Sequence, residues 1–344
     1  MFSDYSSLLI PHSSLLTPHS SFIIHHLSFI IHLKLPPFTF TPILKPTAWG
    51  GTRIAAFKGI EGAGEQIGES WELSGVAGSL SVVDKGPYAG LTLSDLMTRF
   101  GGRLVGDRVY ARCGNTFPLL IKYIDAAHDL SIQVHPDDPT ARRLLHQPNG
   151  KTEMWYILSA AAAARIVYGF NRPVTPQLLA DHCRNDRVME ILGHRAIQEG
   201  DIIYIPAGLV HAICSHTFLI EIQQTSDATF RLYDYGRPRP LHIDQAIQSI
   251  HYNEPLPPTL SGSISCPYFS ARCVSLRAEQ TLTLGGDSFH ILINYSAPFL
   301  LTPPEGEPLL LATGQTALLA AETPAVTLSP ATAQPCRLLS VACP

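Results

Sequence analysis

The chain has 344 residues, enough for one large domain or two smaller ones, and 45% of them are hydrophobic while only 15% are charged. This composition excludes a disordered, solvated chain. The formal net charge is −4, and no extended run of lysine or arginine occurs. Because contacts to phosphates require clustered cations, we expect no nucleic-acid partner.

The seven cysteines form no CxxC pair, and their number is odd. This pattern argues against a disulfide scaffold and against a cysteine-ligated zinc site. It indicates a protein of the reducing cytoplasm.

The first 35 residues differ from the rest of the chain. They contain five of the fifteen histidines in a near-repeat between His12 and His32, and their first basic residue is Lys34. A signal peptide would need an early cation and a small-residue cleavage site. A membrane span would need an apolar run that proline and histidine do not interrupt. We therefore predict that residues 1–35 are a disordered or artefactual extension outside the fold, and we expect no membrane partner.

From Phe38 onward, short apolar runs alternate with proline and glycine, a pattern typical of β architecture. The segment Thr92–Phe100 is predicted to be a helix, because Thr92 can cap it, Asp95 follows three residues later, and two glycines end it. Strands are predicted at Leu119–Ala126, Leu130–His135, Met154–Leu158, Arg165–Tyr168, Asp201–Ile205, Ala212–Cys214 and Thr217–Gln223.

Three further segments have helical periodicity, namely Asp138–His146, Thr175–Leu192 and Ile243–Ile250. The second begins with Thr175 as its cap and a proline in its first position. It interrupts the series of strands, so we predict a small helical insertion near residues 175–192.

A change of composition follows three closely spaced prolines that begin at Pro255. The chain beyond them has few charges and contains short β-prone runs such as Phe289–Tyr295. We therefore predict a catalytic domain over residues 36–254 and a small C-terminal β-domain over residues 255–344 that has no chemistry of its own.

Three segments contain side chains that can bind a metal. In LSIQVHPDD, Gln133 and His135 lie two residues apart, so a strand points both to the same face. In GKTEMWYIL, Glu153 is the only acid at the start of an apolar strand, where a lone carboxylate is costly unless a cation neutralises it. In GDIIYIPAGLVH, a turn at Pro206 and Gly208 can return His211 toward the same interior.

An amide oxygen, two imidazoles and a carboxylate form a mixed set that suits zinc, and also manganese, iron or cobalt. Each residue also has a purely structural interpretation. His135 could lie in a surface turn, Glu153 could pair with Lys151 at a strand end, and Gln133 could simply line the barrel.

The third segment fits the second motif of the cupin superfamily, G-x5-P-x-G-x2-H, from Gly200 to His211. Three features depart from the superfamily pattern. Ser215 stands where an asparagine is usual, Gln133 replaces the first histidine of a pair, and Glu153 arrives only after an inserted helix.

These departures, with the blocks KPTAWGG, GESWELS, PLLIKYIDA and EIQQTSDATFRLYDYGR, resemble the type I mannose-6-phosphate isomerases in their shorter bacterial form. The resemblance extends from Phe38 to Tyr252 and is only loose in the last third. It implies a mainly β fold, a cupin jelly-roll barrel. It also implies that the chain interconverts mannose 6-phosphate and fructose 6-phosphate, through an enediol or enediolate intermediate.

The resemblance also implies one divalent metal ion, with zinc as the expected metal. By position it implies metal ligands at Gln133, His135, Glu153 and His211, a catalytic arginine at Arg231, an active-site lysine at Lys151 and a substrate contact at Ser131. The sequence leaves the proton-transfer group open among a metal-bound water, Lys151 and Asp234. Arg231 has its own structural alternative, a pairing with Asp227 or Asp234.

Two other functions fit parts of the sequence. One is a different metal-dependent cupin enzyme, either a dioxygenase or another sugar isomerase. A dioxygenase would usually leave a ligand position open and present a His₂–carboxylate or three-histidine set, and Gln133 in place of a histidine argues against it. A non-catalytic sugar-binding or regulatory cupin would not need Lys151 and Arg231 beside a complete set of metal ligands. The oligomeric state does not follow from the sequence.

Overall fold

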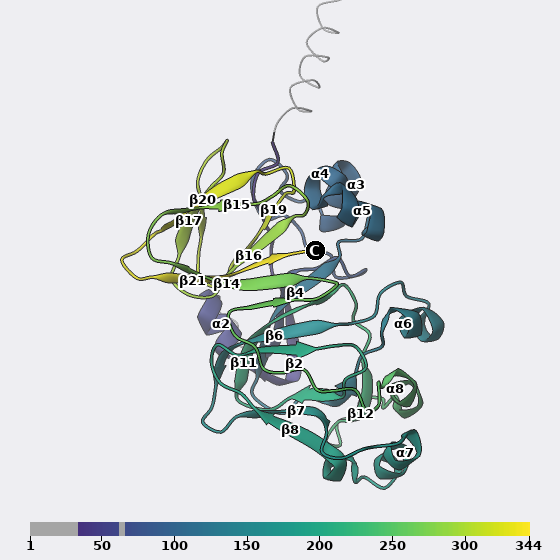
Figure 1. The fold of residues 1–344 in the computed structure, drawn as a ribbon. Coiled ribbons are helices and arrows are strands. Elements are labelled where there is room, and N and C mark those ends of the chain that lie inside the picture. Colours follow the sequence, from purple (N-terminus) through teal and green to yellow (C-terminus); the bar gives the residue numbers. More distant parts are fainter. Residues whose placement is uncertain (1–33, 62–65) are drawn as a thin grey trace, which may run out of the picture. The chain divides into compact units, whose positions relative to one another are not determined.

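The computed structural model describes residues 34–61 and 66–344, so the extension predicted over residues 1–35 lies almost wholly outside the described residues. Residues Leu35–Pro344 form one compact unit. Its regular structure is mainly β, as predicted (Figure 1). The domain boundary near residue 255 stays a prediction.

Two antiparallel sheets form the jelly-roll barrel. The order in the first sheet is β2 (Ile43–Gly51), β3 (Ile67–Leu73), β4 (Leu119–Ala126), β11 (Thr217–Gln224), β6 (Glu153–Ala160) and β9 (Ile202–Ile205). The order in the second sheet is β12 (Phe230–Tyr233), β5 (Ile132–Val134), β10 (His211–Ile213), β7 (Arg165–Phe170) and β8 (Leu192–Ala196). All seven predicted strands are present, and the bounds of Leu119–Ala126 are unchanged.

The two sheets pack face to face around an apolar core. Trp155, Ile157 and Leu219 of the first sheet meet Ile166 and Tyr168 of the second. Because side chains alternate along a strand, the intervening residues of each sheet point outward into two further cores. This arrangement of two sheets is the jelly roll that the sequence predicts.

Three helices cover the outer face of the five-stranded sheet, as the positions of α6, α7 and α8 in Figure 1 show. Leu179 and Ala246 of α7 and α8 pack there against Ile132, Val134 and Phe230. The bounds are α6 (Asp138–Leu145), α7 (Pro176–Arg184) and α8 (Ile243–Ser249).

The helix predicted through Leu192 is shorter than expected. Thr175 caps α7 as predicted, but the helix ends at Arg184 and Asp186 takes a left-handed conformation with φ 55°. A 3₁₀ turn at Val188–Ile191 follows, and Leu192 begins β8. The buried side chains Val188, Ile191 and Leu192 keep an apolar pattern that sequence periodicity could not distinguish from a continuing helix.

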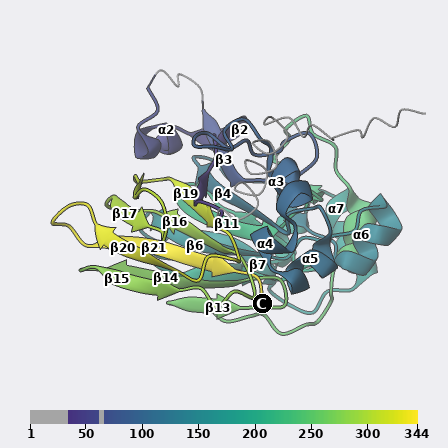
Figure 2. The same cartoon turned by 90° about the horizontal axis from the view of Figure 1, so that it is seen from above.

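Four short helices precede β5, namely α2 (Arg53–Lys58), α3 (Leu93–Phe100), α4 (Gly102–Val105) and α5 (Asp107–Cys113). The predicted cap of α3 is present, because the Thr92 side chain accepts from the Asp95 backbone and the Asp95 carboxylate accepts from the Thr92 backbone. Helices α3, α4 and α5 form one group in both views (Figures 1 and 2).

The C-terminal region forms a second sandwich of two antiparallel sheets. The order in the larger sheet is β1 (Phe38–Thr39), β19 (Thr316–Leu319), β16 (His290–Asn294), β21 (Cys336–Ala342), β14 (Ser270–Leu276) and β13 (Ser263–Ser265). The order in the smaller sheet is β15 (Gln280–Thr283), β20 (Ala325–Pro330), β17 (Phe299–Thr302) and β18 (Leu309–Leu311). The first strand of the described chain therefore belongs to a sheet made otherwise of its last residues.

All seven cysteines are free thiols. The sequence likewise argued against a disulfide scaffold. Among the described residues, no helix is long and apolar enough to cross a membrane.

The stability of the C-terminal sandwich should depend on its closed core. Replacing the fully buried Leu292 of β16 by alanine should lower the free energy of unfolding by about 2–5 kcal/mol, because it leaves a cavity. Urea denaturation measures this loss. The matched change Leu310→Ala, at a side chain that is 50% exposed, should cost less than about 1 kcal/mol. Equal losses in the two variants would contradict the described packing.

Candidate metal centre

Strand register places three of the predicted site residues in one row across the five-stranded sheet. His211 of β10 lies directly opposite Gln133 of β5, and Gln133 lies directly opposite Arg231 of β12. Paired residues on neighbouring strands point to the same face. The chain neighbours of all three pack in the outer core, so the row itself faces the barrel interior.

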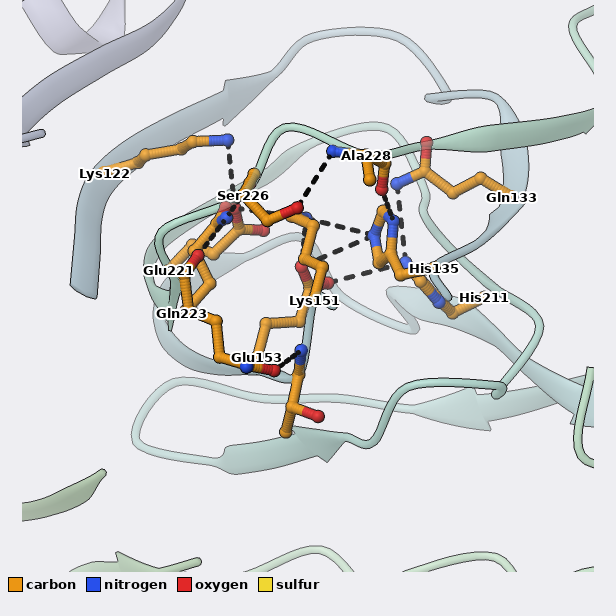
Figure 3. Close-up of polar contacts among 12 residues, drawn as sticks. Lys122, Gln133, His135, Lys151, Glu153, His211, Glu221, Gln223, Ser226 and Ala228 are labelled. Carbon is orange, nitrogen blue, oxygen red and sulfur yellow. Dashed lines mark hydrogen bonds and ion pairs between the residues drawn. The ribbon is translucent and has the colours of Figure 1, made fainter. Parts of the chain in front are cut away.

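His135 and Glu153 meet His211 from two other directions. Glu153 opens β6 in the opposite sheet, and His135 follows β5 two residues after Gln133. The His135 Nε2 atom lies 3.5 Å from one Glu153 oxygen, and the His211 Nε2 atom lies 3.4 Å from the other. Figure 3 shows the three side chains pointing toward one another. All three are at most 1% exposed. Segments that are distant in sequence therefore converge on one interior point.

Hydrogen bonds orient both imidazoles. The Nδ1–H of His135 donates to the Ala228 carbonyl at 2.7 Å, and that of His211 donates to the Leu209 carbonyl at 2.8 Å. Each ring therefore keeps the lone pair on Nε2, which points toward Glu153. Burial lowers the pKa of His211 to about 4, and burial together with Lys151 holds the pKa of His135 well below its usual range. Both rings are neutral at pH 7, the form that binds a metal.

The three side chains fit a bound cation. Their ligand atoms lie within 4.8 Å of one another, and no other such cluster of His, Cys, Asp or Glu occurs in the described residues. The Nε2 atoms of His135 and His211 lie 3.5 Å and 3.4 Å from the two different oxygens of Glu153, close enough for the three side chains to contact one cation. Glu153 Oε1 is buried and has no hydrogen-bond partner within residues 34–61 and 66–344, and burial with the nearby Glu221 raises the pKa of Glu153 to about 7. A cation would satisfy this oxygen.

Lys151 lies inside the same cluster. Its ammonium donates to Glu153 and lies 3.0 Å from His135 Nε2 and 3.7 Å from Glu221. The pairing of Lys151 with Glu153 that the sequence allowed is therefore present. It is not an exposed strand-end contact, however, because both side chains are buried among the imidazoles.

Lys122 and Glu221, two residues not among the predicted site residues, extend the contacts of Lys151 into one charged network. Glu221 lies 3.2 Å from Lys122 and accepts a hydrogen bond from Trp155 at 3.0 Å. Although burial opposes it, the charges of Lys151 and Lys122 lower the pKa of Glu221 to about 2. Lys122 is the only cation in the apolar run PLLIKYIDA, and Glu221 is the only charge in TFLIEIQQ, a signal similar to the one that identified Glu153. That signal could have found both.

Arg231 does not form the structural ion pairs that the sequence allowed. The Asp234 carboxylate instead contacts Arg237 at 3.2 Å and Arg239 at 2.6 Å, and no ion pair joins Arg231 to Asp227 in the described residues. The Nε atom of Arg231 is buried and has no hydrogen-bond partner among the described residues. Its guanidinium is therefore available to a ligand.

Ser131 lies beside the row of site residues and orients Gln133. The Ser131 hydroxyl donates to the Gln133 amide oxygen at 3.2 Å, while the amide nitrogen lies 3.4 Å from His211 Nε2. A half-turn of the Gln133 amide would exchange the positions of its oxygen and nitrogen and so direct the oxygen toward His211. The Gln133 amide is thus adjacent to the three-residue cluster.

A jelly roll whose interior holds a His–Glu–His cluster defines the cupin class. Residues 38–159 match the family described as phosphomannose isomerase type I, catalytic domain. Mannose-6-phosphate isomerase ManA of Bacillus subtilis is 37% identical over 266 residues, 72% of this chain and 81% of that protein. A mannose-6-phosphate isomerase of Streptococcus mutans is 36% identical over 60% of this chain and 65% of its own length.

Solved structures agree with this assignment. The crystal structure of a mannose 6-phosphate isomerase from Bacillus subtilis has a TM-score of 0.79 and 30% identity, and the match covers 89% of this chain and 99% of that one. A putative mannosephosphate isomerase from Archaeoglobus fulgidus has a TM-score of 0.77 at 22% identity over 90% and 98% of the two chains, a likeness of fold. The chain belongs to the type I phosphomannose isomerases.

Removal of one imidazole should empty the centre. The His211→Ala chain should fold but hold far less metal than the wild type after purification, because one neutral nitrogen donor is lost. Elemental analysis of dialysed protein measures the metal per chain. The exposed His194→Ala change on the edge strand β8 is the control and should leave the metal content unchanged. Retention of full metal by His211→Ala would exclude His211 as a ligand.

Proposed function

We propose that this protein interconverts mannose 6-phosphate and fructose 6-phosphate at one divalent metal ion, with zinc as the expected metal. The proposed ligands are Gln133, His135, Glu153 and His211. The observation that carries the proposal is the convergence of two neutral imidazoles and one unsatisfied carboxylate oxygen in a buried interior. Membership of the family gives the reaction class.

An isomerisation of this kind moves a proton between C2 and C1 while the two oxygens exchange carbonyl character. Negative charge develops on those oxygens in the enediolate. A bound zinc ion supplies Lewis-acid stabilisation of that charge. The protein must supply the proton transfer, further positive charge, and a site from which water is largely excluded.

Lys151 is the protein group that we propose for proton transfer. Its ammonium is buried and lies within 3.0 Å of His135 Nε2, at the edge of the cluster. Asp234, the other protein candidate, has its oxygens engaged by Arg237 and Arg239. A carboxylate held by two guanidiniums is a weak base, so the geometry favours Lys151.

Arg231 is the group that we propose for charge stabilisation. Register places it in the row with Gln133 and His211, and its Nε–H points to no protein acceptor in the described part of the chain. A guanidinium stays charged throughout the reaction and presents a rigid set of donors. We propose that Ser131, which is 3% exposed, contacts the substrate beside it.

The two rival functions find less support. A dioxygenase would be expected to have a His-rich set of ligands with open positions, and here an amide occupies the place of a histidine. A binding protein would not need a buried lysine next to the ligands together with Arg231, whose Nε has no hydrogen-bond partner in the described part of the chain, since both cost desolvation energy.

Arg231 should affect turnover and not metal binding. Arg231→Ala should lower kcat/KM for mannose 6-phosphate by about 10²–10³-fold, because a donor aimed at developing charge is lost. An assay that couples fructose 6-phosphate to a later reaction measures this rate. The exposed Arg272→Ala change in β14 is the control and should be neutral. Loss of metal from Arg231→Ala would contradict the proposed role.

Metal removal should abolish turnover reversibly. Dialysis against a chelator should remove activity, and zinc should restore it, because hydrogen bonds to backbone carbonyls hold both imidazoles in orientation. The coupled assay follows the recovery, and an oxygen electrode monitors the same sample. Full activity in protein shown to be metal-free would overturn the mechanism, and oxygen uptake on substrate addition would favour the dioxygenase.

A further inference from the structure

A closed ring of contacts joins two of the segments that carry proposed metal ligands. The Gly208 backbone N–H donates to the His135 carbonyl at 2.9 Å. The His251 backbone N–H donates in turn to the Gly208 carbonyl at 3.0 Å. The His251 side chain then contacts Asp137 through Nε2, at 3.2 Å from Oδ2. Because Asp137 follows His135 by two residues, the path returns to its starting point.

Gly208 and His251 are packed against each other at this ring. Gly208 has φ +85°, a left-handed conformation that favours glycine. A Cβ added there would lie 2.5 Å from Cγ of the His251 imidazole. The imidazole therefore covers the space above the Gly208 backbone, a close approach that only glycine permits.

The segment held in this way carries His211, three residues after Gly208. A cavity of about 360 Å³ is lined by Gly208, Leu209 and Val210 together with His251. His211 also depends on the turn for its orientation, because its Nδ1–H donates to the Leu209 carbonyl.

The other end of the ring is anchored in two helices. Asp137 is the N-cap of α6 and accepts from the Thr140 backbone at 2.8 Å. His251 lies just beyond the end of α8, and its Nδ1 is 3.6 Å from Glu254. The helices that cover the sheet are thereby connected to the turn that presents His211.

We propose that His251 is a positioning residue for the metal centre: it holds the Pro206–Val210 turn against the segment of His135 and so sets the distance between the two imidazoles. This inference rests on the proposed metal site. His251 itself touches neither the cluster nor a reacting atom. Its effect should therefore appear in the affinity for the metal, since residues behind metal ligands typically contribute about 10–100-fold to that affinity.

The first experiment measures zinc affinity directly on the full chain. Wild-type protein and His251→Ala are stripped with a chelator and titrated with zinc in competition with a chromogenic chelator, and apo-protein unfolding is followed in parallel. We expect His251→Ala to bind zinc about tenfold more weakly. The control His194→Ala should bind as the wild type does. The coupled assay is run on the same samples, with zinc in excess.

Two further variants separate the contacts of His251. His251→Phe keeps a ring over Gly208 and loses the contact with Asp137, whereas His251→Gln keeps a donor that can reach Asp137 and loses the ring. Each should weaken zinc binding less than His251→Ala does. They also provide a measurement if His251→Ala fails to fold.

A matched pair of glycines tests the close approach. Gly208 and Gly200 have nearly equal φ, +85° and +89°, but a Cβ at Gly200 meets nothing within 4 Å. Gly200→Ala should therefore cost backbone strain alone and leave zinc affinity unchanged, while Gly208→Ala should weaken it. The double variant Gly208→Ala with His251→Ala should lose less affinity than the two single losses combined, because the clash with the ring has been removed.

The outcomes distinguish the two proposals. Normal zinc affinity in folded His251→Ala, or equal losses in Gly200→Ala and Gly208→Ala, overturns the role of His251 while the metal centre stands. Failure of the wild-type chain to bind zinc overturns the proposed metal centre itself. A change in unfolding temperature without a change in affinity shows that His251 is only structural, and it also overturns the inference.

Discussion

The structure depends on one costly constraint, the burial of the Glu153 carboxylate between two imidazoles. A lone carboxylate in an apolar interior is strongly unfavourable unless a cation compensates it. The barrel meets this demand with Lys151 on one oxygen, while the other lies 3.4 Å from His211 Nε2 and has no hydrogen-bond partner in the described residues. Chains of charges and hydrogen bonds through Lys122, Glu221 and Trp155 then extend the compensation across the first sheet. The polar interior is thus one connected network.

Because side chains alternate along a strand, a charged network can lie next to an apolar core within the barrel. Along β11, Leu219 packs in the barrel core while Glu221, two residues later on the same face, lies in the charged network. The alternate residues Ile220 and Ile222 point to the opposite face and pack in the core outside the six-stranded sheet. One strand therefore contributes to three environments, and substitution of a single residue can change the site without affecting the outward packing.

Local signals in the sequence predicted much of this fold. Apolar runs between turn residues placed β4 and β11 correctly, and the Thr92–Asp95 pair located the start of α3. These features depend on neighbouring residues alone. Periodicity failed at Asp186, where a left-handed residue ends the helix although buried side chains continue in a helical spacing. A backbone reversal of this kind leaves the apolar pattern intact.

Long-range geometry explains what the sequence could not supply. Motif spacing nominated His135, Glu153 and His211, but only strand pairing shows that Gln133 and Arg231 stand in register with His211. Lys122 and Glu221 were visible as isolated charges, yet their partners lie in other strands. Nothing local distinguishes His251 from an ordinary exposed histidine, because the contacts that form the ring are with Gly208 and Asp137, more than forty positions away.

The pairing of β1 with β19 has a consequence for how the chain is assembled. Phe38 and Thr39 pair with Leu318 and Ala317, so the outermost strand of the larger C-terminal sheet comes from the early part of the described chain. A fragment that began after the prolines near residue 255 would leave β19 with a bare row of amide and carbonyl groups. Such an unprotected edge invites pairing with other molecules. During synthesis, the early strand must wait for its partner until nearly the whole protein has emerged from the ribosome.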